Sequence, residues 1–138
     1  MTPAIQQRVR FNASPARLFK LYMDSRQHSV ATHAKAVVSR RPGGRFSAFD
    51  GMITGKMLAI VPNRMIVQAW RAKHWKKTDL DSVLVLTFSK ITDGTQVDLV
   101  HVNVPEHDHD GVKKGWAKYY WKPWRAYLAP GTRKSRAR

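Results

Sequence analysis

The pattern of hydrophobic and polar positions is clearest near the C-terminus, in residues 111–128. Apolar side chains recur there at steps of three and four, which places them on one side of a helix. These side chains are Val112, Trp116, Tyr119, Tyr120, Trp124, Tyr127 and Leu128. Pro123 removes one backbone donor, so we expect a kink at that point. A stripe this rich in aromatic rings needs a large facing surface, and we predict a long helix that lies across a curved sheet.

The beginning of the chain predicts one strand and two short helices. Apolar and polar residues alternate over residues 5–11, which is typical of a strand with one buried face. Ser14 followed by Pro15 is a characteristic helix start, and Leu18, Phe19, Leu21 and Tyr22 give this helix a buried side. Asp24 is expected to cap a second short helix that reaches Ala31.

Residues 34–102 alternate between strand-like segments and turns. We predict strands over residues 34–39, 45–49, 52–61, 64–71, 82–91 and 95–102, and a loop over residues 72–81. The strand over 52–61 is expected to place Ile53, Gly55, Met57 and Ala59 on one face. Asp50-Gly51 and Asp93-Gly94 suit hairpin turns because these residue types tolerate positive φ angles. Consecutive hairpins imply an antiparallel sheet, so the fold class is α+β, with about seven strands.

Composition narrows the class of protein. The chain of 138 residues is long enough for one domain, and it has no apolar run of the ~20 residues that span a bilayer. We find no signal peptide, and the absence of cysteine excludes disulfides and thiolate chemistry, so we expect a cytoplasmic protein. Lys and Arg number 25 against 9 Asp and Glu, a formal net charge of +16. This excess attracts polyanions and suggests an acidic protein as one partner.

Short motifs spread along the chain carry a family resemblance. They are Phe11-Asn12-Ala13-Ser14-Pro15, Gly43-Gly44-Arg45-Phe46, Phe49-Asp50-Gly51, Gly55, Pro62-Asn63, Val67-Gln68-Ala69-Trp70-Arg71, Ser82, Gly94-Thr95, His101, Gly115-Trp116 and Tyr119-Tyr120-Trp121-Lys122-Pro123. In this order and spacing the chain resembles the START-like (SRPBCC, helix-grip) superfamily. Within that superfamily it is similar to the family named for the activator of heat-shock protein 90 ATPase.

The resemblance implies a helix-grip fold, in which a seven-stranded sheet curls around the long helix and often encloses an apolar cavity. Superfamily members use this cavity for lipids, hormones, polyketides or other hydrophobic ligands. The resemblance implies neither an established reaction nor a cofactor. We expect a START-like domain over residues 1–129, a basic flexible tail over residues 130–138, and no second domain of the kind found in the eukaryotic co-chaperone.

A set of mostly aromatic side chains is predicted to bind a small hydrophobic molecule between the sheet and the helix. We assign to it Phe46, Phe49, Met57, Trp70, His101, Trp116 and Tyr120. The alternative is that these side chains fill a solid core. His101 is in phase with Val97 and Leu99, so it faces the apolar side, where it could orient a ligand, transfer a proton or form a core hydrogen bond.

Three other segments give weaker indications of metal, nucleic-acid or phosphate binding. The acidic and histidine residues at 106–110 could bind a metal, but we interpret them as a solvated loop in which Asp110 caps the helix, and we predict no metal site. Trp75 lies among cations at 71–77, which could bind nucleic acid, although an exposed loop at the cavity mouth is favoured. Gly43-Gly44 lacks the spacing of a phosphate-binding loop.

Three functional hypotheses follow from these observations. The first is non-enzymatic binding of a small hydrophobic ligand. The second is a protein-interaction module, similar to the co-chaperone domain, that uses its basic surface on an acidic partner. The third is an enzyme of the polyketide cyclase or hydrolase kind, which would require a solvent-accessible His101 beside an acid.

Overall fold

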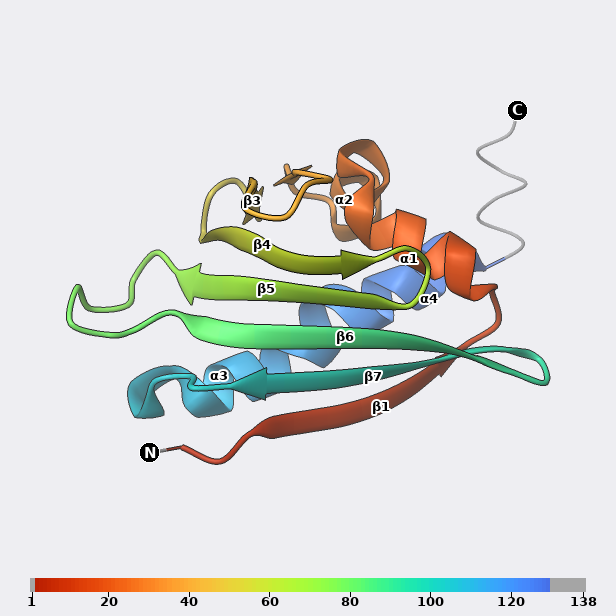
Figure 1. The fold of residues 1–138 in the computed structure, drawn as a ribbon. Coiled ribbons are helices and arrows are strands. Elements are labelled where there is room, and N and C mark those ends of the chain that lie inside the picture. Colours follow the sequence, from red (N-terminus) through yellow and green to blue (C-terminus); the bar gives the residue numbers. More distant parts are fainter. Residues whose placement is uncertain (1, 130–138) are drawn as a thin grey trace.

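The computed structural model describes residues 2–129, and the predicted basic tail at residues 130–138 lies outside the described residues. Seven strands form one antiparallel sheet in the order β1-β7-β6-β5-β4-β3-β2 (Figure 1). The strands are β1 (Ile5–Phe11), β2 (Val37–Val38), β3 (Arg45–Ala48), β4 (Ile53–Val61), β5 (Met65–Ala72), β6 (Ser82–Ile91) and β7 (Gly94–Val102). The first strand therefore pairs with the last, and the predicted curved antiparallel sheet is confirmed.

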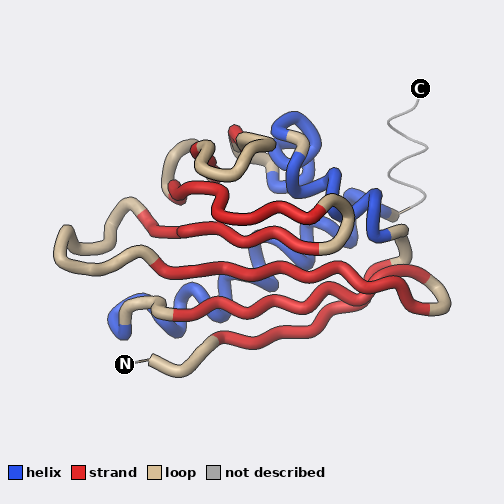
Figure 2. The backbone as a smooth tube through the Cα atoms, in the orientation of Figure 1, coloured by secondary structure: helices blue, strands red, loops and turns tan. Residues whose placement is uncertain are grey.

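The helices all lie on one side of the sheet. The helical elements are α1 (Pro15–Met23), α2 (Ser25–Thr32), α3 (Glu106–Trp116), η1 (Ala117–Trp121) and α4 (Lys122–Leu128). The last three form one continuous helical segment that crosses the sheet, and α1 and α2 lie beside its C-terminal part (Figure 2). The predicted caps are confirmed: Ser14 accepts from the N–H of Arg17, and Asp24 accepts from the N–H of Gln27. No helix within residues 2–129 is both long and apolar enough to cross a membrane.

The core lies between the sheet and this helical segment. Along β5, β6 and β7 every second residue is buried, as the two-residue period of a strand requires. The helical segment contributes Val112, Trp116, Tyr120, Trp121 and Trp124, all of which are buried. The aromatic stripe predicted from the sequence therefore does face the chain's own strands.

One strand is much shorter than predicted. The sequence indicated a strand over residues 34–39, but only Val37 and Val38 pair with β3. The side-chain hydroxyls of two serines in α2 accept hydrogen bonds from this segment: Ser29 from the N–H of Ala36, and Ser25 from the N–H of Val38. These backbone donors are therefore satisfied by a helix instead of a neighbouring strand.

A bulge in β4 changes which side chains face the core. The register shifts between Met57 and Ala59, so that Ile60, opposite the buried Ile66, packs against the core. Ala59 pairs with Val67 on the other face. The prediction that Ala59 shares a face with Met57 was wrong, because the extra residue reverses the alternation.

The C-terminal helical segment begins earlier than predicted. Helix α3 starts at Glu106 with Pro105 as its N-cap, so residues 106–110 are helical and not a loop. Asp110 lies within the helix and forms an exposed ion pair with Lys114 instead of capping. Glu106 and Asp108 occupy the first turn, where carboxylates interact favourably with the helix dipole.

Pro123 is accommodated by a π-helical segment. At the end of η1 the N–H of Lys122 donates to the carbonyl of Ala117, five residues earlier, directly before the residue that has no N–H. The extra residue in this turn rotates the following side chains. As a result Trp121, which the predicted stripe omitted, is buried, whereas Tyr119 is 49% exposed.

Gly55 is required where β4 passes close to β5. A Cβ atom added there would lie 1.8 Å from the carbonyl oxygen of Ala69 and 3.0 Å from the ring of Phe46. We expect Gly55→Ala to lower the free energy of unfolding by about 2 kcal/mol or more, measured by urea denaturation. Gly115→Ala is the control. The added Cβ would lie 3.5 Å from Tyr119, which is an ordinary van der Waals contact, and the free energy of unfolding of this variant should rise by up to about 1 kcal/mol. Equal stability of the two variants would contradict this interpretation.

Candidate functional site

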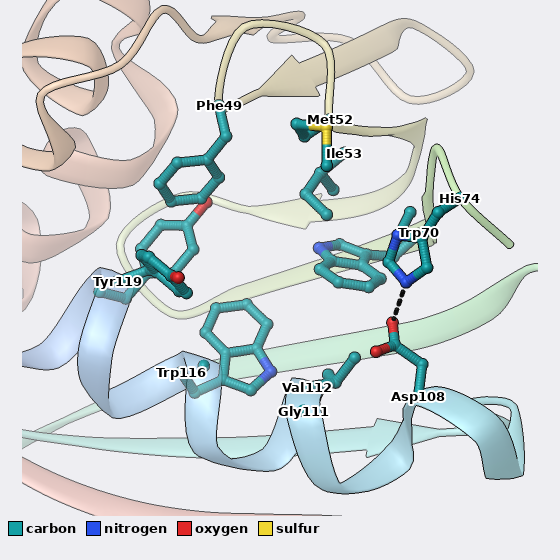
Figure 3. A pocket seen from close by; sticks show the side chains of 13 residues that line it. Phe49, Met52, Ile53, Trp70, His74, Asp108, Gly111, Val112, Trp116 and Tyr119 are labelled. Carbon is teal, nitrogen blue, oxygen red and sulfur yellow. Dashed lines mark ion pairs between the residues drawn. The ribbon is translucent and has the colours of Figure 1, made fainter.

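A pocket of about 450 Å³ lies between the sheet and the C-terminal helical segment (Figure 3). The turn before β4 and the strands contribute one wall, and α3 and η1 contribute the other. The lining residues are Phe49, Met52, Ile53, Trp70, Ala72, His74, Asp108, Gly111, Val112, Gly115, Trp116, Tyr119 and Tyr120. In Figure 3, Phe49 and Tyr119 lie together at one side of the pocket, and Trp70 and His74 lie at the other.

Two glycines on the helix leave room for the pocket. Gly111 and Gly115 are one turn apart in α3 and both line the cavity. Apart from adjacent residues and the backbone of the same helix, a Cβ built at Gly115 has within 4 Å only Tyr119 among the described residues, and a Cβ built at Gly111 has only a carboxylate oxygen of Asp108. Side chains at these positions would project into the space that is now open. This spacing of two glycines within a helix was a signal that the sequence interpretation did not use.

A turn with three successive positive φ angles places Phe49. Phe49, Asp50 and Gly51 have φ angles of 53°, 56° and 89°. The turn is held to the segment after α2, because Asp50 exchanges hydrogen bonds with the backbone of Lys35. A phenylalanine rarely adopts this conformation. The ring of Phe49 packs edge-on against Tyr119 and Tyr120, at centroid distances of 5.7 and 5.4 Å, and these contacts offset part of the backbone strain.

Trp70 lines the pocket and also carries a buried, unsatisfied polar group. Its indole N–H is buried and has no acceptor among the described residues. The ring packs against His101, Trp116 and Trp75 at centroid distances of 4.7, 6.2 and 5.7 Å. A buried donor without a partner costs about 1–3 kcal/mol. The indole N–H of Trp124 is also buried without an acceptor among the described residues, but Trp124 lies in the core and does not line the pocket.

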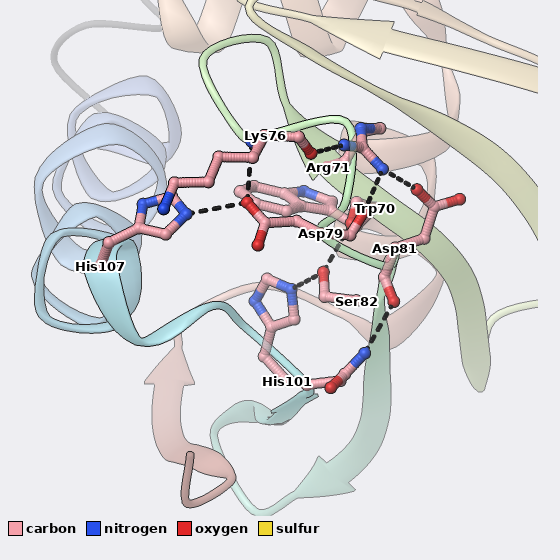
Figure 4. A network of polar contacts seen from close by, with 9 residues as sticks. Trp70, Arg71, Lys76, Asp79, Asp81, Ser82, His101 and His107 are labelled. Atoms are coloured by element: carbon pink, nitrogen blue, oxygen red, sulfur yellow. Dashed lines mark hydrogen bonds and ion pairs between the residues drawn. The ribbon is translucent and has the colours of Figure 1, made fainter. Parts of the chain in front are cut away.

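His101 is held in a chain of hydrogen bonds. The indole N–H of Trp116 donates to Nδ1 of His101 over 3.2 Å, and Nε2 lies 2.8 Å from the hydroxyl of Ser82. Because that hydroxyl donates to the carbonyl of Trp70, Nε2 of His101 is the donor to Ser82 (Figure 4). Burial lowers the pKa of His101 to about 3, so the ring is neutral. Both ring nitrogens are occupied by partners within the protein, and His101 orients Trp116.

A second buried network lies behind Tyr120. Nδ1 of His28 donates to the carbonyl of Tyr22, so Nε2 accepts from the hydroxyl of Tyr120 at 3.0 Å. The hydroxyl of Tyr22 donates to Gln68, whose amide contacts the sulfur of Met57. Burial lowers the pKa of His28 to about 4 and raises the pKa values of both tyrosines, so none of these groups is charged at neutral pH. Tyr120 therefore presents a ring, not a free hydroxyl, to the pocket.

Side-chain hydrogen bonds join the loop between β5 and β6 to the start of α3. The indole N–H of Trp75 donates to Asp108 over 2.7 Å, and Nε2 of His74 lies 3.1 Å from the same carboxylate. His107 bonds to Asp79 at 2.8 Å, which holds the pKa of Asp79 below its ordinary value (Figure 4). The loop was expected to be exposed, but Trp75 within it is buried, so its ring is not available to stack on a nucleic-acid base.

The structure brings together four of the seven residues predicted to bind a ligand. Phe49, Trp70, Trp116 and Tyr120 line the pocket; their role in binding stays a prediction. Phe46, Met57 and His101 are buried in the core outside the pocket lining, because neighbouring side chains cover them. Among residues 2–129, no group of three or more His, Asp or Glu side chains is arranged to hold a metal ion.

Sequence comparison identifies a family. The model described as "Activator of Hsp90 ATPase homolog 1-like protein" matches residues 12–129. "Activator of 90 kDa heat shock protein ATPase homolog 1" from Homo sapiens is 28% identical over 112 residues, which are 81% of this chain and 33% of that protein. The chain thus spans about a third of the length of the curated relatives it matches.

Two solved structures show the same fold. An HSP90 activator from Plasmodium falciparum superimposes with a TM-score of 0.80 and 23% identity, over 88% of this chain and 92% of that one. CalU16 from Micromonospora echinospora has a TM-score of 0.77 and 22% identity, over 95% and 79% of the two chains. At such identities the likeness extends to the fold alone.

The two buried histidines predict a pH dependence of stability. In the unfolded chain a histidine has a pKa of about 6.5, so between this value and the lowered folded values the unfolded state binds more protons. The free energy of unfolding should therefore fall as the pH is lowered from about 6.5 to about 4, by about 1.4 kcal/mol per pH unit for each histidine. Urea denaturation at a series of pH values measures it.

One substitution tests the assignment of this slope. His28→Gln should lower the slope by about the contribution of one histidine, because Gln does not titrate. A stability that does not vary over this pH range would show that the buried imidazoles are protonated in the folded protein.

Proposed function

The chain belongs to the activator of Hsp90 ATPase homolog 1-like family, and we propose that this member binds a small hydrophobic molecule without catalysing a reaction. The observation that carries the proposal is the pocket of about 450 Å³ whose walls are mainly aromatic and aliphatic. Pockets for small molecules commonly measure about 300–1,000 Å³ and combine such walls with few polar groups. Burial of the ligand's apolar surface would supply most of the affinity.

The shape of the walls favours a flat molecule. Trp116 and Tyr120 lie 4.8 Å apart at 32°, and Trp70 lies 6.2 Å from Trp116 at 36°. Rings inclined so little to one another form a continuous apolar surface against which a planar ligand can pack. Met52 and Tyr119, which are 47% and 49% exposed, lie at the pocket wall and would be covered by a bound ligand.

The polar groups favour a ligand with a hydrogen-bond acceptor. The unsatisfied N–H of Trp70 would gain a partner from a carbonyl or ether oxygen. His101, which was first expected to orient the ligand, already bonds to Ser82 and Trp116, and the hydroxyl of Tyr120 bonds to His28. We therefore assign the orienting contact to Trp70, and the apolar contacts to Phe49, Trp116 and Tyr120.

A second candidate function is that of a protein-interaction module. Relatives from Homo sapiens and Dictyostelium discoideum are named activators of a 90 kDa heat shock protein ATPase. This chain could act on such a partner through the exposed cations of its C-terminal helical segment, which are Lys113, Lys114, Lys118, Lys122 and Arg125. The third candidate, a hydrolase or cyclase that uses His101, has less support, because this histidine is fully buried and both its nitrogens are occupied.

Filling the pocket tests the first function. Nile red, a neutral planar dye with a carbonyl oxygen, should bind the wild-type chain saturably with a rise in fluorescence. Gly115→Leu places a side chain in the cavity, so the dissociation constant should increase about tenfold or more. Trp70→Phe keeps an aromatic ring but removes the donor, and should weaken binding by about two- to tenfold.

The matched control adds bulk outside the pocket. Ala126 is exposed on α4, so Ala126→Leu should bind the dye like the wild type. Thermal unfolding of each variant separates loss of binding from loss of fold. Absence of saturable binding to the wild type, together with no small molecule retained in native mass spectra after detergent-free purification, would refute the proposal.

The second function predicts a different response to the same variants. The chain should raise the ATPase rate of a purified 90 kDa heat shock protein, and added salt should reduce this effect because exposed charges are screened. Lys118→Glu combined with Lys122→Glu should abolish the stimulation, whereas Gly115→Leu should leave it intact. Stimulation that is insensitive to salt and to both lysines would exclude the basic surface as the contact.

A further inference from the structure

The pocket between the sheet and the C-terminal helical segment contains the carboxylate of Asp108. This residue is in the first turn of α3, and its side chain is 19% exposed. No other Asp or Glu within residues 2–129 lines the pocket, and no Lys or Arg of that range does so. The chain as a whole has 25 Lys and Arg and a formal net charge of +16. The charge of the pocket lining therefore differs in sign from that of the rest of the protein.

One oxygen of this carboxylate has two partners, and the other has none. Oδ2 accepts from the indole N–H of Trp75 over 2.7 Å and lies 3.1 Å from Nε2 of His74. Within residues 2–129, no hydrogen bond or ion pair involves Oδ1. In Figure 3, Oδ1 is the carboxylate oxygen without a dashed line, on the side of Asp108 towards Val112.

Gly111 leaves this free oxygen accessible from the pocket. A Cβ atom added at Gly111 would lie 3.0 Å from Oδ1 of Asp108, so even a small side chain there would crowd the oxygen. Gly111 and Asp108 both line the pocket. A carboxylate that is mostly shielded from water interacts strongly with a nearby charge, because solvent and salt screen it less. Its hydrogen bonds to charged donors are roughly twice as strong as bonds between neutral groups.

The aromatic walls also favour a positive charge. The rings that line the pocket are those of Phe49, Trp70, Trp116, Tyr119 and Tyr120. The face of an aromatic ring carries partial negative charge, and a cation within about 6 Å of the ring centre is attracted by about 0.5–2 kcal/mol. Rings of this kind beside a carboxylate suit an organic cation better than a neutral molecule of the same shape.

We propose that the ligand of this pocket is a planar organic cation, such as a heteroaromatic ring with a positively charged nitrogen. Its ring packs against Trp70, Trp116 and Tyr120, and its charge lies beside Oδ1 of Asp108. This inference rests on the proposed binding of a hydrophobic molecule in the same pocket, and it specifies the charge of that molecule.

A pair of dyes that differ in charge tests this inference by fluorescence titration. Thioflavin T is planar and carries a permanent positive charge, and its uncharged analogue lacks the methyl group on the ring nitrogen. The wild-type chain should bind thioflavin T about tenfold more tightly than the analogue, because only the charged dye gains from the carboxylate and the ring faces. Gly115→Leu should weaken the binding of both dyes, since both occupy the same pocket.

Two matched substitutions in α3 test the role of Asp108. Asp108→Asn removes the charge but keeps an oxygen that can accept from Trp75. It should weaken the binding of thioflavin T about tenfold more than that of the analogue. Asp110→Asn removes the same charge two residues further along α3, from a side chain that is 77% exposed and does not line the pocket. This control should change the affinity for either dye by less than about twofold.

The titration with Nile red separates this inference from the function on which it rests. If Nile red binds but the wild type binds both benzothiazole dyes equally, the cation preference is overturned and hydrophobic binding stands. Equal effects of Asp108→Asn and Asp110→Asn on thioflavin T would also overturn it. If neither Nile red nor thioflavin T binds, both proposals are wrong. Thermal unfolding shows whether each variant is folded, and the comparison of the two dyes on the wild type decides the question even if Asp108→Asn is not.

Discussion

The packing of aromatic rings between the C-terminal helical segment and the sheet is the interaction on which the remainder of the structure depends. Trp116, Tyr120 and Trp124 of this segment are all buried, and their neighbours include Trp70 of β5 and Tyr22 of α1. These rings bring together the sheet, the first helix and the last helical elements. Because aromatic side chains bury large apolar areas, this contact dominates the core.

The same packing requires that each polar atom among the rings find a partner. His101 accepts from Trp116 and donates to Ser82, and His28 accepts from Tyr120 and donates to the backbone of Tyr22. In both cases the imidazole is neutral and its orientation is defined by two bonds. The histidines therefore specify which way the neighbouring rings face, a structural role that leaves no ring nitrogen for chemistry.

The pocket exists because the aromatic packing is interrupted. Gly111 and Gly115 have no side chains, which leaves space beside one stretch of α3. Phe49, in its strained turn, lines the wall of the pocket opposite this stretch. Trp70, which belongs to both the core and the pocket wall, has an indole N–H with no acceptor within residues 2–129. A backbone in an unfavourable conformation and an unsatisfied donor beside the same cavity are the kind of local cost that is tolerated where a site serves a function.

The sequence by itself determined the order and type of the elements, and it identified Trp116, Tyr120 and Trp124 as aromatic residues that face the sheet. Period-two alternation, helix caps and the spacing of Trp116, Tyr120 and Trp124 are local properties, and a local pattern is sufficient to predict them. The family resemblance, carried by short motifs such as Gly43-Gly44-Arg45-Phe46, supplied the helix-grip fold and the expectation of a cavity. Four residues of the pocket wall were predicted on this basis.

Only the tertiary structure decided which side chains meet the cavity and which lie behind it. The bulge in β4 and the π turn before Pro123 each insert one residue, which reverses or rotates the faces that simple periodicity assigns to Ala59 and Trp121. The loop around Trp75 was predicted to be exposed, but Trp75 itself is buried, and Asp108, 33 residues away, accepts its indole N–H. Such outcomes depend on contacts between distant segments. No window of sequence contains them, because they arise only when the helix and the sheet are packed together.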